Sequence, residues 1–376
     1  MTMKRFETVF CRIFSCCSRS IIVMSMFAVT STAWSESPKA VWEAISDKSG
    51  ASSCQPVLFD HPSAIAADSK DNLYVTSEEG PYVIRKITPD GQILPLLTRS
   101  QIKNDGHGSY TGLSIALDKD GNIFIAVDKR KTIEKVNADG TLSLVAGQPG
   151  KSGMANGDAK SATFKNLKAI AIDASKSIYV TDSKVIRKVT ATDKVSILAG
   201  KETSKWEYVD AKGAKARFPD PHGLAVDKDG NVLIADGGGK EDEGKVFAYG
   251  AIRKINTEGK VETVVGSSNV AINDLDGTGA QADIPDVYGI AIAKSGEIYV
   301  TEIYSAISIR QISAKWEVSG LFATDSLEPM QLDEPVGIVA ASDGNLYVVA
   351  SKTNKLFRID TASKITTLCL PVIKKQ

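Results

Sequence analysis

Hydrophobic and polar residues alternate along most of the chain in short runs, and turns rich in Asp, Gly and Asn separate these runs. Each repeat has an apolar alternating run, a tight turn, a second run of the Ile-Tyr-Val-Thr type and two further strand-like runs. The turns recur about every ten residues, so each repeat is expected to hold four short strands. Six such repeats begin at Ser63, Leu113, Lys168, His222, Tyr288 and Val336.

The turn sequences indicate how the strands reverse direction. Residues 118–122 and 227–231 read Asp-Lys-Asp-Gly-Asn, which supplies a glycine for positive φ and side chains that bond their own backbone. One four-stranded unit leaves two apolar faces uncovered, so the units must stack, and six twisted sheets arranged radially close into a ring. The sequence therefore predicts an all-β fold, a six-bladed β-propeller of four-stranded antiparallel blades.

The clearest repeat runs from residue 222 to 236, His-Gly-Leu-Ala-Val-Asp-Lys-Asp-Gly-Asn-Val-Leu-Ile-Ala-Asp, and continues with Ala-Ile-Arg-Lys-Ile at 251–255. With its counterparts between about residues 57 and 370, it resembles the NHL-repeat propellers. That resemblance implies the fold, but members of the family bind proteins, RNA or small ligands and a few are enzymes, so it does not decide the function. Two positions depart from the pattern: Glu134 stands where Arg is usual, and Ala293 where Asp is usual.

The first 35 residues differ from the rest of the chain. A basic start is followed by the apolar stretch from Ile21 to Val29 and by small residues before Ser35, which together are typical of a secretory signal peptide. The apolar core of about ten residues is short of the roughly 20 that span a bilayer, although a retained anchor is the alternative. We expect an exported protein, periplasmic or secreted, with no membrane span after cleavage.

The remaining chain divides into an N-terminal extension, 36–56, and the propeller, 57–376. Within the extension, residues 37–46 are expected to form either a short helix or an added edge strand. Blades 1 and 6 each hold four strands in sequence, so closure of the ring needs no strand from the other terminus. Once residues 1–35 are removed, Cys54 and Cys369 are the remaining cysteines, and we expect a disulfide between them in an oxidising compartment. Two unpaired thiols are the alternative.

Composition excludes some classes of partner. The chain has 45 basic and 45 acidic residues and no block of Lys and Arg, so nucleic acid is not an expected partner. A hydrophobic content of 43% excludes a disordered chain. We expect a monomer.

Candidate site residues come from the mouth of the central channel. The loops that enter the innermost strands converge there from all blades, which makes this mouth the default binding location. One register consists of the six repeat starts, and the other, two residues earlier, consists of His61, Thr111, Asn166, Asp220, Asp286 and Glu334. The expected ligand-binding residues are Lys168, His222, Tyr288 and Asn166.

A metal site is a second interpretation of the residues at the channel mouth. Asp220, Asp286 and Glu334, with the amide of Asn166, are hard oxygen ligands suited to Ca²⁺ or another divalent metal. Solvated turn residues are the competing interpretation. The acidic residues that end the second strands are expected to form structural pairs with third-strand arginines, Asp182 with Arg187, Asp236 with Arg253 and Glu302 with Arg310.

Two enzyme families with a similar fold bear on catalysis. Gluconolactonase-like propellers hold a divalent metal with Glu, Asn and Asp just before the innermost strand's Gly-hydrophobic pair, where this chain has residues such as Lys168 and Tyr288. Peptide-amidating lyases hold zinc with histidines, and His222 in Pro-His-Gly resembles one such ligand position. His61 and His107 do not share its register.

The sequence therefore favours an exported NHL-repeat propeller that acts as a binding module for a protein, peptide or glycan through its loop-rich face. The alternative is a metal-dependent hydrolase or lyase, lactonase-like or peptide-amidating-lyase-like, at the channel mouth. Residues 236–244 of blade 4 form a longer connection than blade 3 needs. It is expected to project over the channel mouth, unless it is a plain solvated loop.

Overall fold

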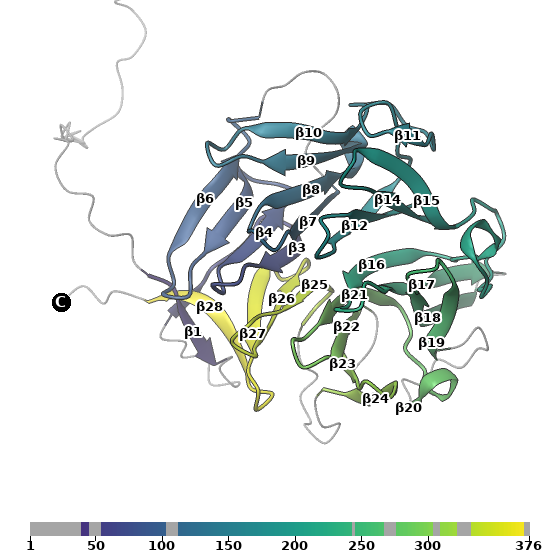
Figure 1. The fold of residues 1–376 in the computed structure, drawn as a ribbon. Helices are drawn as coiled ribbons and strands as arrows, with labels where there is room; N and C mark the ends of the chain where they lie inside the picture. Colours follow the sequence, from purple (N-terminus) through teal and green to yellow (C-terminus); the bar gives the residue numbers. More distant parts are fainter. Residues whose placement is uncertain are drawn as a thin grey trace, which may run out of the picture. The chain divides into compact units, whose positions relative to one another are not determined.

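In this computed structural model, described residues are 39–44, 54–102, 112–242, 245–266, 276–303, 309–321 and 332–371. Six antiparallel sheets surround a central axis, and in each the first strand is innermost (Figure 1). The prediction of a six-bladed propeller is confirmed. The expected signal peptide, Thr111 and His107 lie outside the described residues.

The blades follow one another along the chain. Blade 1 is β3 (Pro62–Ala67), β4 (Leu73–Ser77), β5 (Tyr82–Ile87) and β6 (Ile93–Thr98). Blade 2 is β7 (Leu113–Leu117), β8 (Ile123–Val127), the 3₁₀ turn η1 (Asp128–Arg130), β9 (Thr132–Val136) and β10 (Leu142–Gly147). Blade 3 is β12 (Leu167–Ile172), β13 (Ile178–Asp182), β14 (Val185–Val189) and β15 (Lys194–Gly200), with β11 (Gly157–Asp158) on its outer edge.

Blades 4 to 6 repeat this order. Blade 4 is η2 (Gly213–Lys215), β16 (Pro221–Val226), β17 (Val232–Asp242), β18 (Lys245–Ile255) and β19 (Val261–Gly266). Blade 5 is β20 (Gly277–Thr278), η3 (Gly279–Gln281), β21 (Val287–Ile292), β22 (Ile298–Glu302), β23 (Ile309–Ile312) and β24 (Glu317–Gly320). Blade 6 is β25 (Pro335–Ala340), β26 (Leu346–Ala350), β27 (Lys355–Ile359) and β28 (Ile365–Pro371).

The core consists of six apolar clusters, and each cluster joins strands of two neighbouring blades. The cluster around Val75 and Val349, for example, joins blade 1 to blade 6. This follows from the strand patterns, because side chains alternate between the two faces of a blade and both faces are covered. Burial between blades therefore holds the inner strands, and the loops before them, in fixed positions around the axis.

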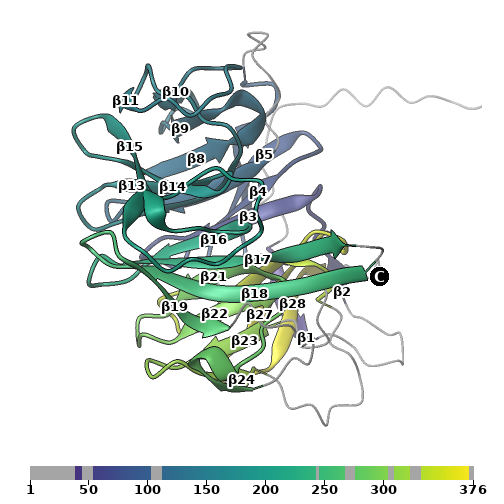
Figure 2. The same ribbon diagram turned by 90° about the vertical axis from the view of Figure 1, so that its right-hand side faces the viewer.

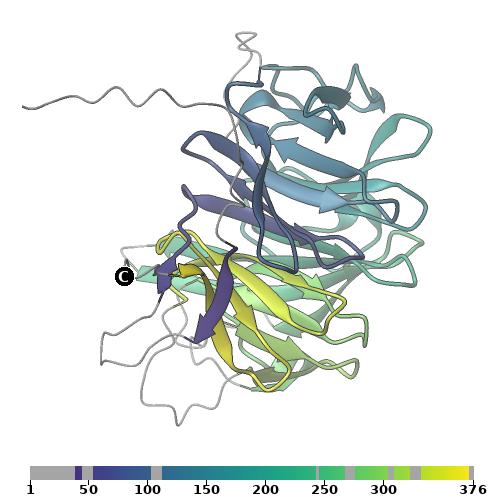
Figure 3. The same cartoon turned by 90° about the vertical axis from the view of Figure 1, so that its left-hand side faces the viewer.

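Two strands from the N-terminal extension complete blade 6. β1 (Val41–Ala44) pairs with the outer strand β28, and β2 (Cys54–Pro56) pairs with β28 as well. Figure 3 shows β1 lying against the C-terminal blade. The backbone N–H of Ala40 also donates to the carbonyl of Gly91 in blade 1, at 2.8 Å. The edge-strand alternative is thus the observed one. Blades 1 and 6 each hold four strands in sequence, as expected, and β1 and β2 lie outside the four of blade 6.

The expected blade 4 loop is instead a long hairpin. β17 and β18 pair from Val232↔Ile255 out to Asp242↔Lys245, so most of residues 236–244 is strand. The hairpin reaches beyond the other strands of its blade (Figure 2). No helix within the described ranges has the length and apolar character needed to span a bilayer.

A buried arginine on the third strand ties blades 3 and 4 to the site loops. Arg187 Nη1 donates to Asp182 Oδ2 at 3.0 Å, and Arg253 Nη1 donates to Asp236 Oδ2 at 3.0 Å, as the sequence predicted. Both guanidinium groups and both carboxylates are fully buried. Burial raises the pKa of Asp236 to about 7, although its ion pair with Arg253 acts in the opposite direction.

Each of these carboxylates also fixes the loop that enters the innermost strand. Asp182 Oδ1 accepts the backbone N–H of Asn166 at 2.8 Å, and Asp236 Oδ1 accepts that of Asp220 at 3.0 Å. The arginine therefore holds the carboxylate, and the carboxylate holds the backbone of a residue at the channel mouth.

Candidate functional site

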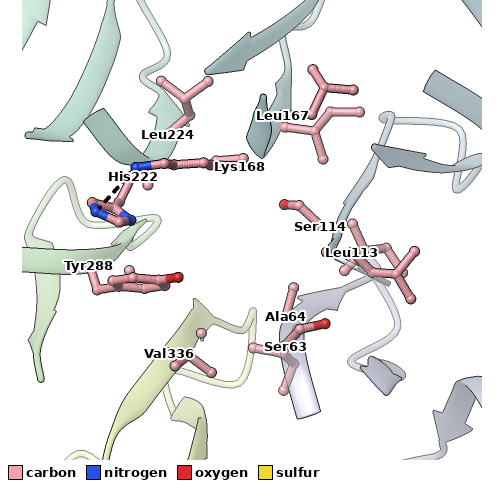
Figure 4. Close-up of a pocket in the computed structure, with 18 of the residues that line it drawn as sticks. Ser63, Ala64, Leu113, Ser114, Leu167, Lys168, His222, Leu224, Tyr288 and Val336 are labelled. Carbon is pink, nitrogen blue, oxygen red and sulfur yellow. Dashed lines mark hydrogen bonds between the residues drawn. The ribbon is translucent and has the colours of Figure 1, made fainter. Parts of the chain in front are cut away.

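A cavity of about 290 Å³ lies at the mouth of the central channel, and all six innermost strands contribute to its wall. Figure 4 looks into it and shows side chains from the different blades pointing toward its centre. The cavity has the location that the sequence predicts, because the entry loops of all blades converge there. Its wall includes the six repeat starts Ser63, Leu113, Lys168, His222, Tyr288 and Val336.

One side of this wall is polar and comes from three successive blades. Lys168 on β12, His222 on β16 and Tyr288 on β21 lie side by side (Figure 4). Lys168 Nζ forms an ion pair with Asp220, which stands just before β16. His222 Nε2 lies 3.0 Å from Asp220 Oδ2, and the His222 and Tyr288 ring centroids are 4.3 Å apart. These four residues are called the polar cluster below.

Hydrogen bonding in the polar cluster fixes the state of His222. A carboxylate only accepts hydrogen bonds, so Nε2 carries the proton and donates it to Asp220. Lys168 Nζ, 3.4 Å from Nε2, then contributes charge rather than a second bond. Burial lowers the pKa of His222 and the Lys168 charge lowers it further, whereas the bond to Asp220 acts in the opposite direction.

The pKa of Asp220 is lowered as well, which favours the charged form of this carboxyl group. Burial alone would raise its pKa, but the His222 hydrogen bond and the charges of His222 and Lys168 outweigh burial and lower it. At neutral pH Asp220 is therefore a carboxylate and His222 a neutral imidazole. His222 Nδ1 is buried and has no hydrogen-bond partner among the described residues.

Deeper in the cavity the wall becomes apolar. The position two residues after each repeat start is aliphatic in every blade, and each of these side chains is also part of an apolar cluster between blades. The rim of the cavity is thus partly polar, and the deeper part of its wall is aliphatic. The six residues are Ile65, Ile115, Ile170, Leu224, Ile290 and Ile338.

Two carboxylates on the cavity wall were missed by the sequence analysis. Glu78 directly follows β4 and Asp128 directly follows β8, so both occupy the end of a second strand. The sequence analysis considered the acidic residues that end second strands, such as Asp182, whereas Glu78 and Asp128 stand one position later. Asp128 Oδ1 is bound by Lys131 Nζ at 2.7 Å, whereas Glu78 Oε1 accepts the backbone N–H of Gly112 at 3.1 Å.

The structure brings together all four expected ligand-binding residues, since Asn166 also lines the cavity. The three expected metal ligands behave differently. Asp220 is engaged by Lys168 and His222, Glu334 Oε2 accepts Ser351 Oγ at 3.2 Å, and Asp286 is buried. No group of three or more His, Cys, Asp and Glu residues in the described part of the chain is arranged to hold a metal ion. A metal site at Asp220, Asp286 and Glu334 therefore stays a prediction.

Residues 218–240 match the family model of the NHL repeat, over β16 and most of β17. The protein is a six-bladed β-propeller with an NHL repeat. The resemblance found in the sequence is confirmed at this level. None of the curated proteins matches the propeller in sequence.

Solved structures show what the propeller is similar to. A Bacteroides thetaiotaomicron protein of unknown function is 15% identical with a TM-score of 0.56, over 83% of this chain and 70% of that one. A catalytically inactive virginiamycin B lyase from Staphylococcus aureus, with quinupristin, is 15% identical with a TM-score of 0.51, over 85% and 89%. A protein described as a putative gluconolactonase is 12% identical with a TM-score of 0.51, over 88% and 98%. At these identities the likeness concerns the fold alone.

Proposed function

We propose that this NHL-repeat propeller is an exported binding protein that takes up part of a peptide or glycan at the mouth of its channel. The observation that carries the proposal is the polar cluster, in which three blades place Lys168, His222 and Tyr288 on one wall of a cavity. Small-molecule sites usually measure about 300–1,000 Å³. A cavity of about 290 Å³ therefore suits a small group rather than a whole protein domain.

The shape and chemistry of the cavity favour end-on binding. Polar groups at the rim fix orientation through hydrogen bonds, and the aliphatic depth takes up apolar surface, which is the usual division of work in ligand sites. Lys168 and Asp220 are each partly exposed, with side-chain exposures of 21% and 31%, so a ligand can contact both. Because Arg253 and Asp236 hold the loop at Asp220, the cluster is preorganised and little ordering is needed on binding.

The test is a thermal-shift and calorimetric screen of the mature protein against short peptides and oligosaccharides. A ligand at a hundred times its Kd stabilises the folded state by about 2.7 kcal/mol. Val336→Trp places a large side chain on the cavity wall and is expected to remove the shift. Leu94→Trp, on an exposed position of β6, is the matched control. Binding that survives Val336→Trp and follows Leu94→Trp instead would place the site elsewhere.

A second candidate is acid–base catalysis, as in a hydrolase or lyase. The lowered pKa of His222 favours it, because a general base must be neutral at the working pH and Asp220 orients this imidazole. Lactones and cyclic peptide esters are the first substrates to try, with His222→Asn as the comparison. Turnover that disappears in His222→Asn would support catalysis, whereas binding without turnover supports the binding protein.

A further inference from the structure

Opposite charges line different sides of the cavity. Lys168 comes from blade 3, whereas Glu78 comes from blade 1, and both are part of the wall. Among the residues that the structure describes, no Lys or Arg lies within ion-pair distance of Glu78, and its carboxylate accepts a hydrogen bond from the backbone N–H of Gly112. Glu78 is partly exposed. The wall therefore carries a carboxylate whose charge no described side chain neutralises.

Lys168 is placed to bind a second anion beside Asp220. Its ammonium has three donors, and Asp220 is its ionic partner in the described structure. His222 Nε2 donates its N–H to Asp220, so it does not accept a hydrogen bond from Lys168. At least one Lys168 donor is therefore left for a group inside the cavity, next to the Tyr288 ring.

We propose that the cavity binds a short zwitterionic peptide with apolar side chains, its carboxylate at Lys168 and its ammonium at Glu78. This inference rests on the proposed binding function and names its ligand class. In a zwitterion each charge meets a group of opposite charge on the wall, the carboxylate at Lys168 beside Asp220 and the ammonium at Glu78. The aliphatic ring at the base of the cavity, which includes Ile170 and Ile290, takes up an apolar side chain.

The alternatives fit the wall less well. A neutral saccharide would bury the Glu78 charge without a partner charge, which costs more than leaving it in water. A simple anion would be repelled by Glu78, and a simple cation would pair with Glu78 but leave the remaining Lys168 donor without an acceptor. Only a ligand with both charges satisfies both walls.

The experiment compares Leu-Leu with two capped forms, N-acetyl-Leu-Leu and Leu-Leu amide, by isothermal calorimetry on the mature protein. Each cap removes one charge, and a charge-assisted hydrogen bond contributes enough that its loss weakens binding about 10- to 100-fold. Cellobiose is the uncharged comparison. Leu-Leu is expected to bind most tightly, with both capped forms weaker and cellobiose not binding.

Two variants assign each charge of the ligand to one wall. In Lys168→Met, Leu-Leu and Leu-Leu amide are expected to bind with equal affinity, while Leu-Leu still binds more tightly than N-acetyl-Leu-Leu. In Glu78→Gln, Leu-Leu and N-acetyl-Leu-Leu are expected to bind with equal affinity, while Leu-Leu still binds more tightly than Leu-Leu amide. Lys165→Met, at an exposed residue just before β12, is the matched control and is expected to keep both preferences.

The outcomes separate the inference from the proposed function. Equal binding of Leu-Leu and both capped forms, or preferences unchanged in both variants, would overturn the zwitterion inference. Binding of cellobiose but not of Leu-Leu would overturn it as well, while leaving the binding function in place. If no peptide or saccharide binds and Val336→Trp changes nothing, the proposed function fails together with the inference.

Discussion

Arg130 Nε donates to Glu134 Oε1 at 3.1 Å, and both side chains are almost completely buried. Glu134 lies opposite Ile125 on the second strand of its blade, the register position that Arg187 and Arg253 occupy in blades 3 and 4. Blade 2 has therefore kept the buried ion pair with its charges exchanged. The sequence marked Glu134 as a departure from the repeat, and Arg130 in the turn η1 explains how the blade tolerates it.

Removing one partner of the Arg130–Glu134 pair is expected to lower the free energy of unfolding more than removing both. Glu134→Gln leaves the Arg130 charge buried and should lower the free energy of unfolding by about 3 kcal/mol. The double variant Arg130→Met with Glu134→Leu should cost less, because no charge is left behind. Urea denaturation of Arg130→Met, Glu134→Leu and the double variant measures the coupling. Additive effects of the two single changes would show that the pair is not coupled.

Blade 1 lacks the carboxylate that blades 3 and 4 use. Ser77 ends β4 where Asp182 ends β13, and Arg85 pairs with Val75 as Arg187 pairs with Val180. Ser77 Oγ and Arg85 Nη2 are buried without a hydrogen-bond partner in the described structure, and the nearest acid, Asp60, is 4.0 Å from Nη2.

Ser77→Asp is therefore expected to stabilise the protein. The new carboxylate would meet Arg85 as Asp182 meets Arg187, for a gain of about 1 kcal/mol after the cost of burying it. Ser77→Asn has nearly the same shape without the charge and serves as the control. Thermal and urea denaturation decide the matter, and an Asp variant no more stable than the Asn variant would contradict the prediction.

The sequence predicted the parts of the molecule that depend on local pattern. The six repeat starts predicted the wall residues Lys168, His222 and Tyr288, because the register of an inner strand follows directly from alternation. The contacts of Asp220 with Lys168 and His222 were not predicted, because Lys168 comes from the neighbouring blade and the spacing of one repeat does not show which side chains meet. Arg130 was not predictable as the partner of Glu134, because it lies in a turn and the repeat pattern has no place for it.

The N-terminal strand is expected to stabilise the ring through Trp42. Its ring lies 5.3 Å from the Tyr347 ring, and the Arg358 guanidinium lies 5.3 Å from the Trp42 ring centroid, both in blade 6. Trp42→Ala should lower the free energy of unfolding by about 2 kcal/mol, because a partly buried aromatic side chain is lost. Trp42→Phe keeps part of this contact and should cost less. Equal stability of all three proteins in urea would mean that β1 contributes nothing to closure.

The Cys54–Cys369 disulfide stays a prediction, and the strand register places the two cysteines on adjacent strands. In the pairing of β2 with β28, Cys54 lies opposite Pro371 and Pro56 lies opposite Cys369, so the cysteines are offset by two residues on adjacent strands. The Cys54 side chain is outside the described part of the chain. Digestion without reductant should give one cross-linked peptide, and Cys54→Ser should lower stability by about 2–4 kcal/mol. Alkylation of both thiols before reduction would contradict the bond.

The titration of His222 provides a direct readout of the polar cluster. Burial and the charge of Lys168 lower its pKa, so an NMR titration of the imidazole should have its midpoint below 6.5. Lys168→Met removes a neighbouring positive charge and should raise the pKa, whereas Asp220→Asn removes the stabilising partner of the imidazolium and should lower it. Opposite shifts in the two variants are the diagnostic result, and shifts in the same direction would contradict the arrangement.

The same titration sets a pH dependence of stability. Because the pKa of His222 is lower in the folded protein than in the unfolded chain, the unfolded chain binds more protons between the two values. The contribution of His222 to stability is therefore complete above about pH 6.5, falls as the pH drops toward the folded pKa, and is constant below it. His222→Gln should remove this component from a series of urea denaturations between pH 4.5 and 7.5, leaving the slope due to the carboxylates. A slope that is the same in both proteins would show that His222 does not titrate as its surroundings require.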